Sequence, residues 1–181
     1  MRKWIGYYQG IVSDNICDEI INYSQNQKPL QPSTYSTSSG KSDRSKERVK
    51  MDDGWFRKGE KFYDDIRKSF QEVIRRYQEK HPDFVCQRHT DFRLNKYSYG
   101  GFMSRHVDNI HHSHGQEYGY PQVSSLLFLN DNYKGGQLKI SNTTYNTKKG
   151  SAIIFPSNFM FPHEVNLITE GTRYSIVTWL M

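Results

Sequence analysis

The stretch of sequence that decides the fold lies near the middle of the chain and reads Tyr97-Ser98-Tyr99-Gly100-Gly101-Phe102-Met103-Ser104-Arg105-His106-Val107-Asp108. Its two consecutive glycines allow a sharp backbone turn, which would carry the next segment to the mouth of a barrel. That segment ends in His-x-Asp. Because residues two apart in a strand point to the same face, the His106 imidazole and the Asp108 carboxylate can bind one ion.

A third candidate ligand follows far downstream, in the segment Phe161-Pro162-His163-Glu164-Val165. His163 is distant enough in sequence to lie on a different strand and to approach the same ion from another side. Two histidines and one carboxylate form the facial triad of non-haem Fe(II) oxygenases, which leaves coordination positions open for a cosubstrate and O₂.

The chain around these residues is rich in short β segments. From Val85 onward, runs of Tyr, Phe, Ile, Val and Thr alternate with Gly, Asn and Asp, which is typical of an all-β sandwich or barrel. Closing such strands into a jelly roll leaves a cavity mouth for a ligand. The expected strands are 84–97, 104–108, 123–129, 137–140, 151–155, 163–167 and 173–180.

The N-terminal part has a different pattern. Ser13 is a suitable N-cap for a helix over 15–23, and apolar residues at helical spacing predict a second helix over 62–77, ending before Pro82. The polar stretch between them, about 28–54, is expected to be a mobile loop. We therefore predict a single domain, 1–181, in which residues 1–83 provide helical support and residues 84–181 form the β core.

Composition narrows the class of protein. The 181 residues fit one domain, and two cysteines give no disulfide framework, so a reducing cytoplasm is expected. We find no apolar run long enough for a membrane span and no signal peptide. The net charge of +6 is compatible with nucleic-acid contact or attraction of acidic molecules, but a solvated loop and helix face is the favoured interpretation.

His-x-Asp alone is a weak signal, because the chain contains it three times. The copy at 81–83 contains a proline that favours a turn. The copy at 89–91 lies in a plausible strand and is a genuine rival to His106. Three further histidines follow the central motif: His111, His112 and His114. The Asn, Ser and Gly residues among them favour a loop at the rim over metal ligation.

The last predicted strand carries a cation on a face suited to a barrel lining. Alternation places Arg173, Ser175, Val177 and Trp179 on one face. A buried guanidinium without a partner is costly, so an arginine here implies an anionic ligand. Arginine binds carboxylates through two parallel hydrogen bonds, which makes an acidic small molecule the natural candidate.

In this order, the motifs resemble those of the Fe(II)- and 2-oxoglutarate-dependent dioxygenases, in particular the prolyl 4-hydroxylase-like branch. The resemblance covers nearly the whole chain outside the polar stretch. The matching elements are Tyr97 to Gly100, His106 to Asp108, Gly135-Gly136-Gln137-Leu138, Gly150-Ser151-Ala152-Ile153-Ile154-Phe155, His163, and Arg173 with Ser175 and Trp179.

The resemblance implies a mainly β (α+β) fold, the double-stranded β-helix, with Fe(II) on the triad. It also implies that Arg173 and Tyr97 hold the distal carboxylate of 2-oxoglutarate, with Ser175 and Trp179 in the same pocket. O₂ is the second cosubstrate, and ascorbate is included among the cofactors. Two departures stand out: Met103 replaces a tyrosine common in the branch, and collagen-type members commonly have lysine in place of Arg173.

The activity implied is hydroxylation of a prolyl residue in a peptide or protein, coupled to oxidative decarboxylation of 2-oxoglutarate to succinate and CO₂. One alternative is the same chemistry on another acceptor, whether another amino-acid residue, a small molecule or a nucleic acid. A second alternative is a non-catalytic β-barrel binding module with a metal. Nucleic acid is not favoured, because Lys and Arg are not interleaved with aromatic residues as in a strand-binding groove.

Overall fold

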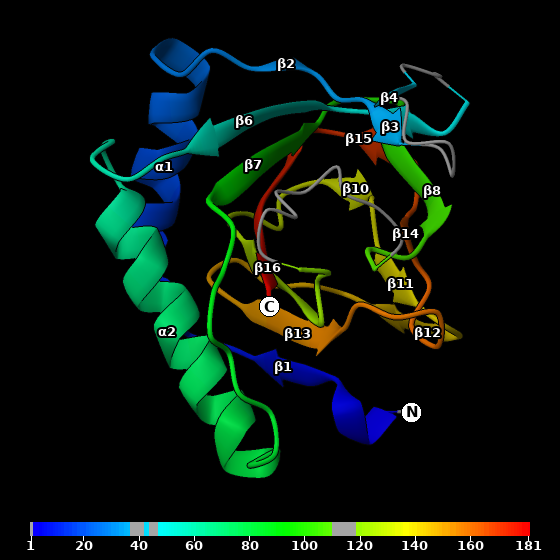
Figure 1. The fold of residues 1–181 in the computed structure, drawn as a ribbon. Coiled ribbons are helices and arrows are strands. Elements are labelled where there is room, and N and C mark those ends of the chain that lie inside the picture. The colour runs from blue at the N-terminus through cyan, green and yellow to red at the C-terminus, as the bar shows by residue number, and fades with distance from the viewer. Residues whose placement is uncertain (1, 37–41, 44–46, 110–118) are drawn as a thin grey trace.

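A computed structural model describes residues 2–36, 42–43, 47–109 and 119–181. Two antiparallel sheets enclose a barrel, and two helices cover the outer face of the larger sheet (Figure 1). The predicted mainly β fold, a double-stranded β-helix with supporting N-terminal helices, is confirmed. No helix in the described ranges combines the length and apolar character needed to cross a membrane.

Both predicted helices are present and slightly longer than expected. Helix α1 spans Asp14–Asn26, and the Ser13 hydroxyl accepts a hydrogen bond from the Ile16 amide, as an N-cap does. Helix α2 spans Tyr63–Lys80 and ends before Pro82. Each helix turns an apolar stripe toward the sheet; the stripe of α2 is Ile66, Phe70, Val73 and Tyr77. A short 3₁₀ turn, Arg2–Trp4, precedes the first strand.

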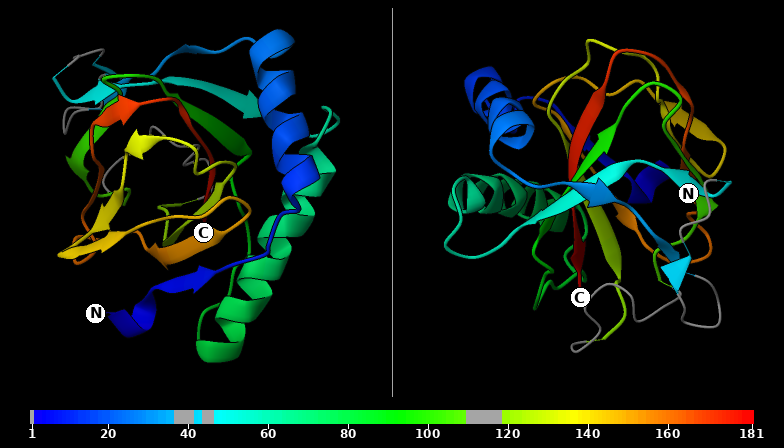
Figure 2. Two further views of the ribbon diagram at one scale, coloured as in Figure 1. Left: turned by 180° about the vertical axis from the view of Figure 1, so that it is seen from behind. Right: turned by 90° about the horizontal axis from the view of Figure 1, so that it is seen from above.

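The larger sheet has seven strands in the order β1-β13-β9-β16-β7-β6-β2. Figure 2 shows both helices on one side of it. Its central strands, β9 and β16, are buried along their whole length, as strands covered on both faces are. The bounds are Gly6–Tyr8 (β1), Gln31–Pro32 (β2), Asp52–Phe56 (β6), Phe92–Tyr97 (β7), Val123–Phe128 (β9), Ala152–Pro156 (β13) and Arg173–Leu180 (β16).

The smaller sheet has five strands in the order β12-β11-β14-β8-β5 and closes the barrel opposite the larger one. Its bounds are Val49–Lys50 (β5), Phe102–His106 (β8), Leu138–Ile140 (β11), Thr143–Tyr145 (β12) and His163–Val165 (β14). Two further two-stranded pairs are Tyr35–Ser36 with Ser42–Asp43 (β3, β4) and Lys134–Gly135 with Ile168–Glu170 (β10, β15).

The N-terminal part differs from the prediction in two ways. Described residues within the expected 28–54 loop form strands, and three of these join the main sheets: β6 pairs with β7, β2 pairs with β6, and β5 pairs with β8. Residues 1–83 are therefore not only a helical support. The strand expected from residue 84 begins at Phe92. Strands β2 and β5 have two residues each, which is too short for alternation to be detected in the sequence. Strand β6 has five residues, but it begins with Asp-Asp-Gly, which are residues typical of loops.

The larger sheet separates two apolar clusters, because its side chains alternate between its faces. On β7, Phe92 and Leu94 join the cluster that includes α1 and α2, whereas Tyr97 joins the cluster inside the barrel. We call these two environments the helix side and the barrel interior.

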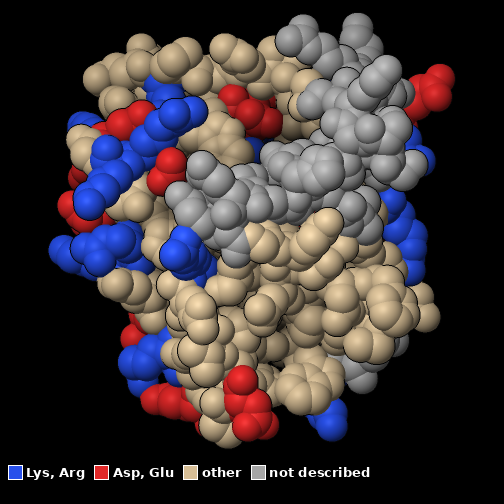
Figure 3. All heavy atoms as spheres, in the orientation of Figure 1, with Lys and Arg blue, Asp and Glu red and all other residues tan. Residues whose placement is uncertain are grey.

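Several of the positively charged residues lie on α2, where they pair with acidic residues. Figure 3 shows Lys and Arg interspersed with Asp and Glu on the side of the molecule where the helices lie. On α2, Arg75 and Arg76 pair with Glu72, and Arg67 pairs with Asp64. A surface on which cations and anions neutralise each other is typical of a solvated helix face.

Candidate metal centre

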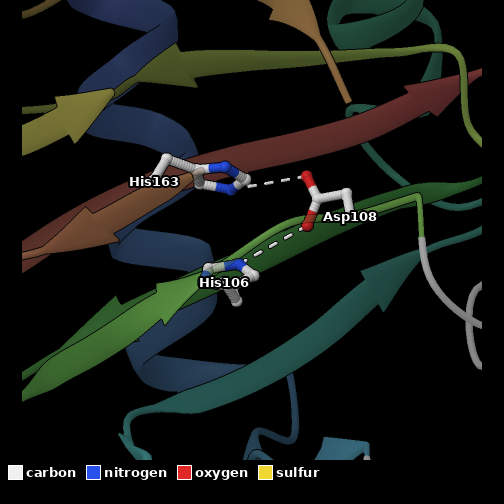
Figure 4. A group of neighbouring side chains, drawn as sticks. All are labelled: His106, Asp108 and His163. Carbon is white, nitrogen blue, oxygen red and sulfur yellow. Dashed lines mark ion pairs between the residues drawn. The ribbon is translucent and has the colours of Figure 1, made fainter. Parts of the chain in front are cut away.

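The structure brings His106, Asp108 and His163 together in the barrel (Figure 4). One potential ligand atom from each lies within 4.8 Å of the others. His106 ends β8 and His163 begins β14, and the two residues are directly paired between these strands. Asp108 lies just beyond β8, so the expectation that it shares a strand with His106 is wrong. Its carboxylate nevertheless lies close to both imidazoles.

Backbone carbonyls orient both imidazole rings. The Nδ1 atom of His106 lies 2.8 Å from the Ser104 carbonyl, and that of His163 lies 3.2 Å from the Phe161 carbonyl. A carbonyl only accepts hydrogen bonds, so each Nδ1 donates its proton and each neutral ring keeps a lone pair on Nε2.

Both lone pairs are directed at Asp108. Each Nε2 atom lies 3.4 Å from one oxygen of the Asp108 carboxylate. In this tautomer the unprotonated Nε2 atoms face carboxylate oxygens, so acceptors face acceptors. That arrangement favours a cation between them, and the donor set of two imidazoles and one carboxylate fits Fe(II).

Burial keeps His163 in the form that a metal requires. The loss of solvent lowers the pKa of this imidazole from 6.5 to about 4, against the opposing effect of the Asp108 charge. His163 is therefore neutral near pH 7 without a metal and needs no deprotonation to act as a ligand.

Two buried serines position the carboxylate, and neither was predicted. The Ser124 hydroxyl donates to Asp108 Oδ2 at 2.5 Å and lies 2.8 Å from the Ser157 hydroxyl. Both serines are fully buried. A small polar residue at a lining position of an apolar strand is the only sequence signal for Ser124, and such serines are common in ordinary strands.

Arg173 is buried in the same barrel, on β16. It is 1% exposed, and its Nη1 donates to the Ser175 hydroxyl at 3.0 Å. Nε and Nη2 have no hydrogen-bond partner in the part of the chain that the structure describes. Leaving such atoms unpaired costs roughly 1–3 kcal/mol each, so a bound anion would stabilise this side chain.

Two neighbours shape the space around this guanidinium. Its Cζ lies 5.1 Å from the Tyr97 ring centroid, and Tyr97 is the residue paired with Arg173 between strands. Gly136 has a φ of +63°, and a Cβ there would lie 2.3 Å from Ile168 and 3.2 Å from the Arg173 side chain. The Gly135-Gly136 turn at the end of β10 can therefore pass close to the Arg173 side chain.

The remaining predicted pocket residues also line the barrel. Tyr97 is buried, and the loss of solvent raises the pKa of its hydroxyl, opposed by the Arg173 charge. Ser175 serves Arg173 directly as a hydrogen-bond acceptor. Trp179 is 1% exposed and packs 6.2 Å from the Trp55 ring.

The rival His-x-Asp at residues 89–91 is not part of this cluster. His89 forms an isolated bridge with Leu180, and its ring stacks on Phe92, 5.3 Å between centroids. His81 packs against Trp4 and Tyr77. Three other histidines considered above lie outside the described residues: His111, His112 and His114.

Comparisons with known proteins agree with this architecture. The family model for the 2OG-Fe(II) oxygenase superfamily matches residues 92–181. A PKHD-type hydroxylase of Rippkaea orientalis is 39% identical over 93 residues, which is 48% of this chain and 40% of that protein. A PKHD-type hydroxylase of Stenotrophomonas maltophilia is 30% identical over 127 residues, which is 64% of this chain and 55% of that protein. The chain thus spans about half the length of these relatives.

Solved structures share the fold at low sequence identity. A Pseudomonas putida prolyl-4-hydroxylase superposes with a TM-score of 0.74 at 17% identity, covering 98% of this chain and 91% of that one. A prolyl hydroxylase from Trichoplax adhaerens, in complex with a hypoxia inducible factor peptide fragment, gives a TM-score of 0.77 at 18% identity, covering 99% and 84%. The chain belongs to the 2OG-Fe(II) oxygenase superfamily and has the fold of its prolyl 4-hydroxylase-like branch.

Proposed function

We propose that the protein is an Fe(II)- and 2-oxoglutarate-dependent dioxygenase that hydroxylates a prolyl residue in a peptide or protein. The observation that carries this proposal is the coexistence, in one barrel, of the His106-Asp108-His163 cluster and of Arg173, two of whose buried nitrogens have no partner among the described residues. The first fits a redox metal with open positions, and the second fits the far carboxylate of 2-oxoglutarate.

When bound, Fe(II) with 2-oxoglutarate and O₂ supplies the oxidative decarboxylation to succinate and CO₂ and the oxidation of an acceptor C–H bond. The two histidines would hold the metal through Nε2 while carbonyls retain the protons on Nδ1. Asp108 would be the third ligand, oriented by Ser124. Arg173 would bind and orient the cosubstrate, with Tyr97 beside it, in a setting that excludes water.

The choice of a prolyl acceptor rests on similarity. Proteins of the same fold are prolyl hydroxylases, and one of them is bound to a peptide fragment. We keep ascorbate as a proposed accessory reductant and the cytoplasm as the proposed compartment. Both Cys17 and Cys86 are free thiols, which suits a reducing environment.

The first experiment incubates the protein with Fe(II), 2-oxoglutarate, ascorbate and proline-rich peptides. We expect release of succinate and a peptide mass gain of about 16 Da, the mass of one oxygen atom. Succinate release with a mass gain on another acceptor, such as an oligonucleotide, would overturn the prolyl assignment and retain the chemistry. Absence of metal-dependent 2-oxoglutarate consumption under all conditions would favour a non-catalytic binding module.

A further inference from the structure

A second arginine, Arg93, also lies on the barrel-interior face of β7. Its neighbours Phe92 and Leu94 belong to the helix-side cluster, so alternation directs Arg93 and Tyr97 to the opposite face. Tyr97 is paired with Arg173, and Arg93 is paired with Val177. The two arginines therefore occupy opposite ends of one strip formed by β7 and β16.

Arg93 is at the end of this strip that reaches the metal cluster. Its Cζ lies 4.8 Å from the centroid of the Trp179 ring. Trp179 is paired with Ser124 on β9, and the Ser124 hydroxyl donates a hydrogen bond to Asp108. An acceptor that brings a C–H bond to the metal must enter this region, whereas Arg173 stands at the far end.

The described residues leave part of the Arg93 guanidinium without a partner. Its Nε atom is buried without a hydrogen-bond partner, and no ion pair forms with it among the described residues. Asp53, on the neighbouring strand β6, is paired in register with Asn95 and forms no ion pair with Arg93. The Asn95 side chain lies between the two arginines in sequence and on the same face, and its Oδ1 is also buried and unpaired.

These observations describe a polar strip with a cation at each end, inside the barrel that also holds the metal cluster. One cation is assigned above to the cosubstrate, which leaves Arg93 for the other ligand that must approach the metal. The guanidinium lies over the Trp179 ring, a cation–π contact that restrains its orientation. Its unpaired Nε is a hydrogen-bond donor available to a carboxylate. Arg93 as a whole is half-buried, but its Nε atom is buried and unpaired among the described residues, so the guanidinium favours a negative partner.

We propose that Arg93 binds a carboxylate of the acceptor, so that the acceptor is a prolyl residue beside an acidic residue or a free amino acid. This inference rests on the proposed function and adds the charge of the substrate to it. An arginine that only supports the Trp179 ring would leave the choice of acceptor unchanged, and that difference makes the proposal testable.

The test uses matched probes that differ only in one carboxylate. The first pair is a peptide with blocked termini containing Ala-Pro-Glu-Ala and its Ala-Pro-Gln-Ala counterpart. The second pair is L-proline and L-prolinamide. Calorimetry under anaerobic conditions, on protein loaded with Fe(II) and 2-oxoglutarate, gives the affinity for each probe without turnover.

We expect the wild-type protein to bind the carboxylate member of one pair about tenfold or more tightly than its neutral counterpart. Arg93→Gln should abolish this preference, and Arg93→Lys should retain part of it, because lysine keeps the charge without the planar fork. Arg67→Gln, which removes an exposed arginine on α2, is the matched control and should keep the full preference. The responding pair identifies the source of the carboxylate, peptide or free amino acid.

The proposal is overturned if Arg93→Gln and the wild type bind both carboxylate probes equally well. It is also overturned if neither protein binds them. Calorimetry with 2-oxoglutarate alone separates this result from failure of the proposed function. Arg93→Gln should bind 2-oxoglutarate with the affinity of the wild type. A wild-type protein that does not bind 2-oxoglutarate would contradict the proposed function itself. Equal thermal unfolding of the two proteins excludes misfolding as the cause.

Discussion

The two faces of strands β7 and β16 are built for different purposes. On the helix side, Phe92, Leu94 and Ile176 pack in an apolar cluster against α1 and α2. On the barrel interior, the same strands present Arg93, Asn95 and Arg173 with buried polar atoms that lack partners among the described residues.

The difference separates stability from function within one sheet. Apolar burial on the helix side contributes folding free energy, and unpaired polar groups in the interior reduce it. Such a cost persists where a ligand compensates it. Substitutions on the helix side should therefore lower the free energy of unfolding without changing the site. Substitutions of the interior polar groups should leave the fold intact and remove binding or turnover.

The largest expected effect is on the barrel interior. His106→Ala and His163→Ala should each reduce succinate release to background. Each variant keeps only two of the three protein ligands, and two ligands are expected to bind Fe(II) weakly. Circular dichroism should show an intact fold in both variants. Full activity in either one would contradict the proposed metal centre.

On the helix side, the substitution expected to destabilise the protein most is Phe92→Ala. Phe92 is 1% exposed and stacks on Phe70, 5.3 Å between centroids. Its truncation should cost about 3–5 kcal/mol of unfolding free energy in urea denaturation. The folded fraction should bind 2-oxoglutarate with normal affinity, and a large loss of affinity would erase the contrast between the faces.

The interior also makes stability depend on pH. The pKa of His163 is about 4 in the folded protein and 6.5 as the reference for the unfolded chain, so protons bind the unfolded state more tightly. The unfolding free energy of the metal-free protein should thus fall by up to about 3 kcal/mol as pH drops from about 6.5 to 4. Above pH 6.5 this group should contribute no pH dependence.

Denaturation of His163→Asn across the same pH range is the control. This variant cannot titrate at residue 163 and should show a flatter profile than the wild type. Identical profiles would mean that His163 is not held neutral by burial.

The cosubstrate end should respond more mildly than the metal. Arg173→Gln should raise the 2-oxoglutarate concentration required for half-maximal succinate release about 100-fold, since a charge-assisted bidentate contact contributes roughly 3 kcal/mol. Ser175→Ala should have a smaller effect in the same direction. An unchanged requirement in Arg173→Gln would place the cosubstrate carboxylate elsewhere.

The smallest effect is expected at the serine that orients Asp108. Ser124→Ala should weaken metal affinity about tenfold, as loss of a residue supporting a ligand does. Competition with a chelator measures it. An equal loss in Ser69→Ala, which alters an exposed hydroxyl on α2, would show that the effect is not specific.

Much of this architecture could be predicted from the sequence. Helical periodicity predicts α1 and α2, and the order of His106, Asp108, His163 and Arg173 along the chain indicates the site. Spacing alone could not exclude His89, because only the three-dimensional fold shows that its ring packs on Phe92.

Other features were beyond sequence reasoning for physical reasons. Strands β2 and β5 have two residues each and show no alternation. Ser124 is an ordinary strand residue until Asp108 is placed against it. Arg93 would be taken as a solvent-facing cation, because a sheet with two covered faces cannot be recognised from one strand.

The most direct test of the account is a crystal structure of the protein soaked anaerobically with Fe(II) and 2-oxoglutarate. We predict one metal ion bound by His106, Asp108 and His163, with the far carboxylate of 2-oxoglutarate on Arg173. A metal ion bound at His89 instead, or a 2-oxoglutarate carboxylate that does not contact Arg173, would contradict it.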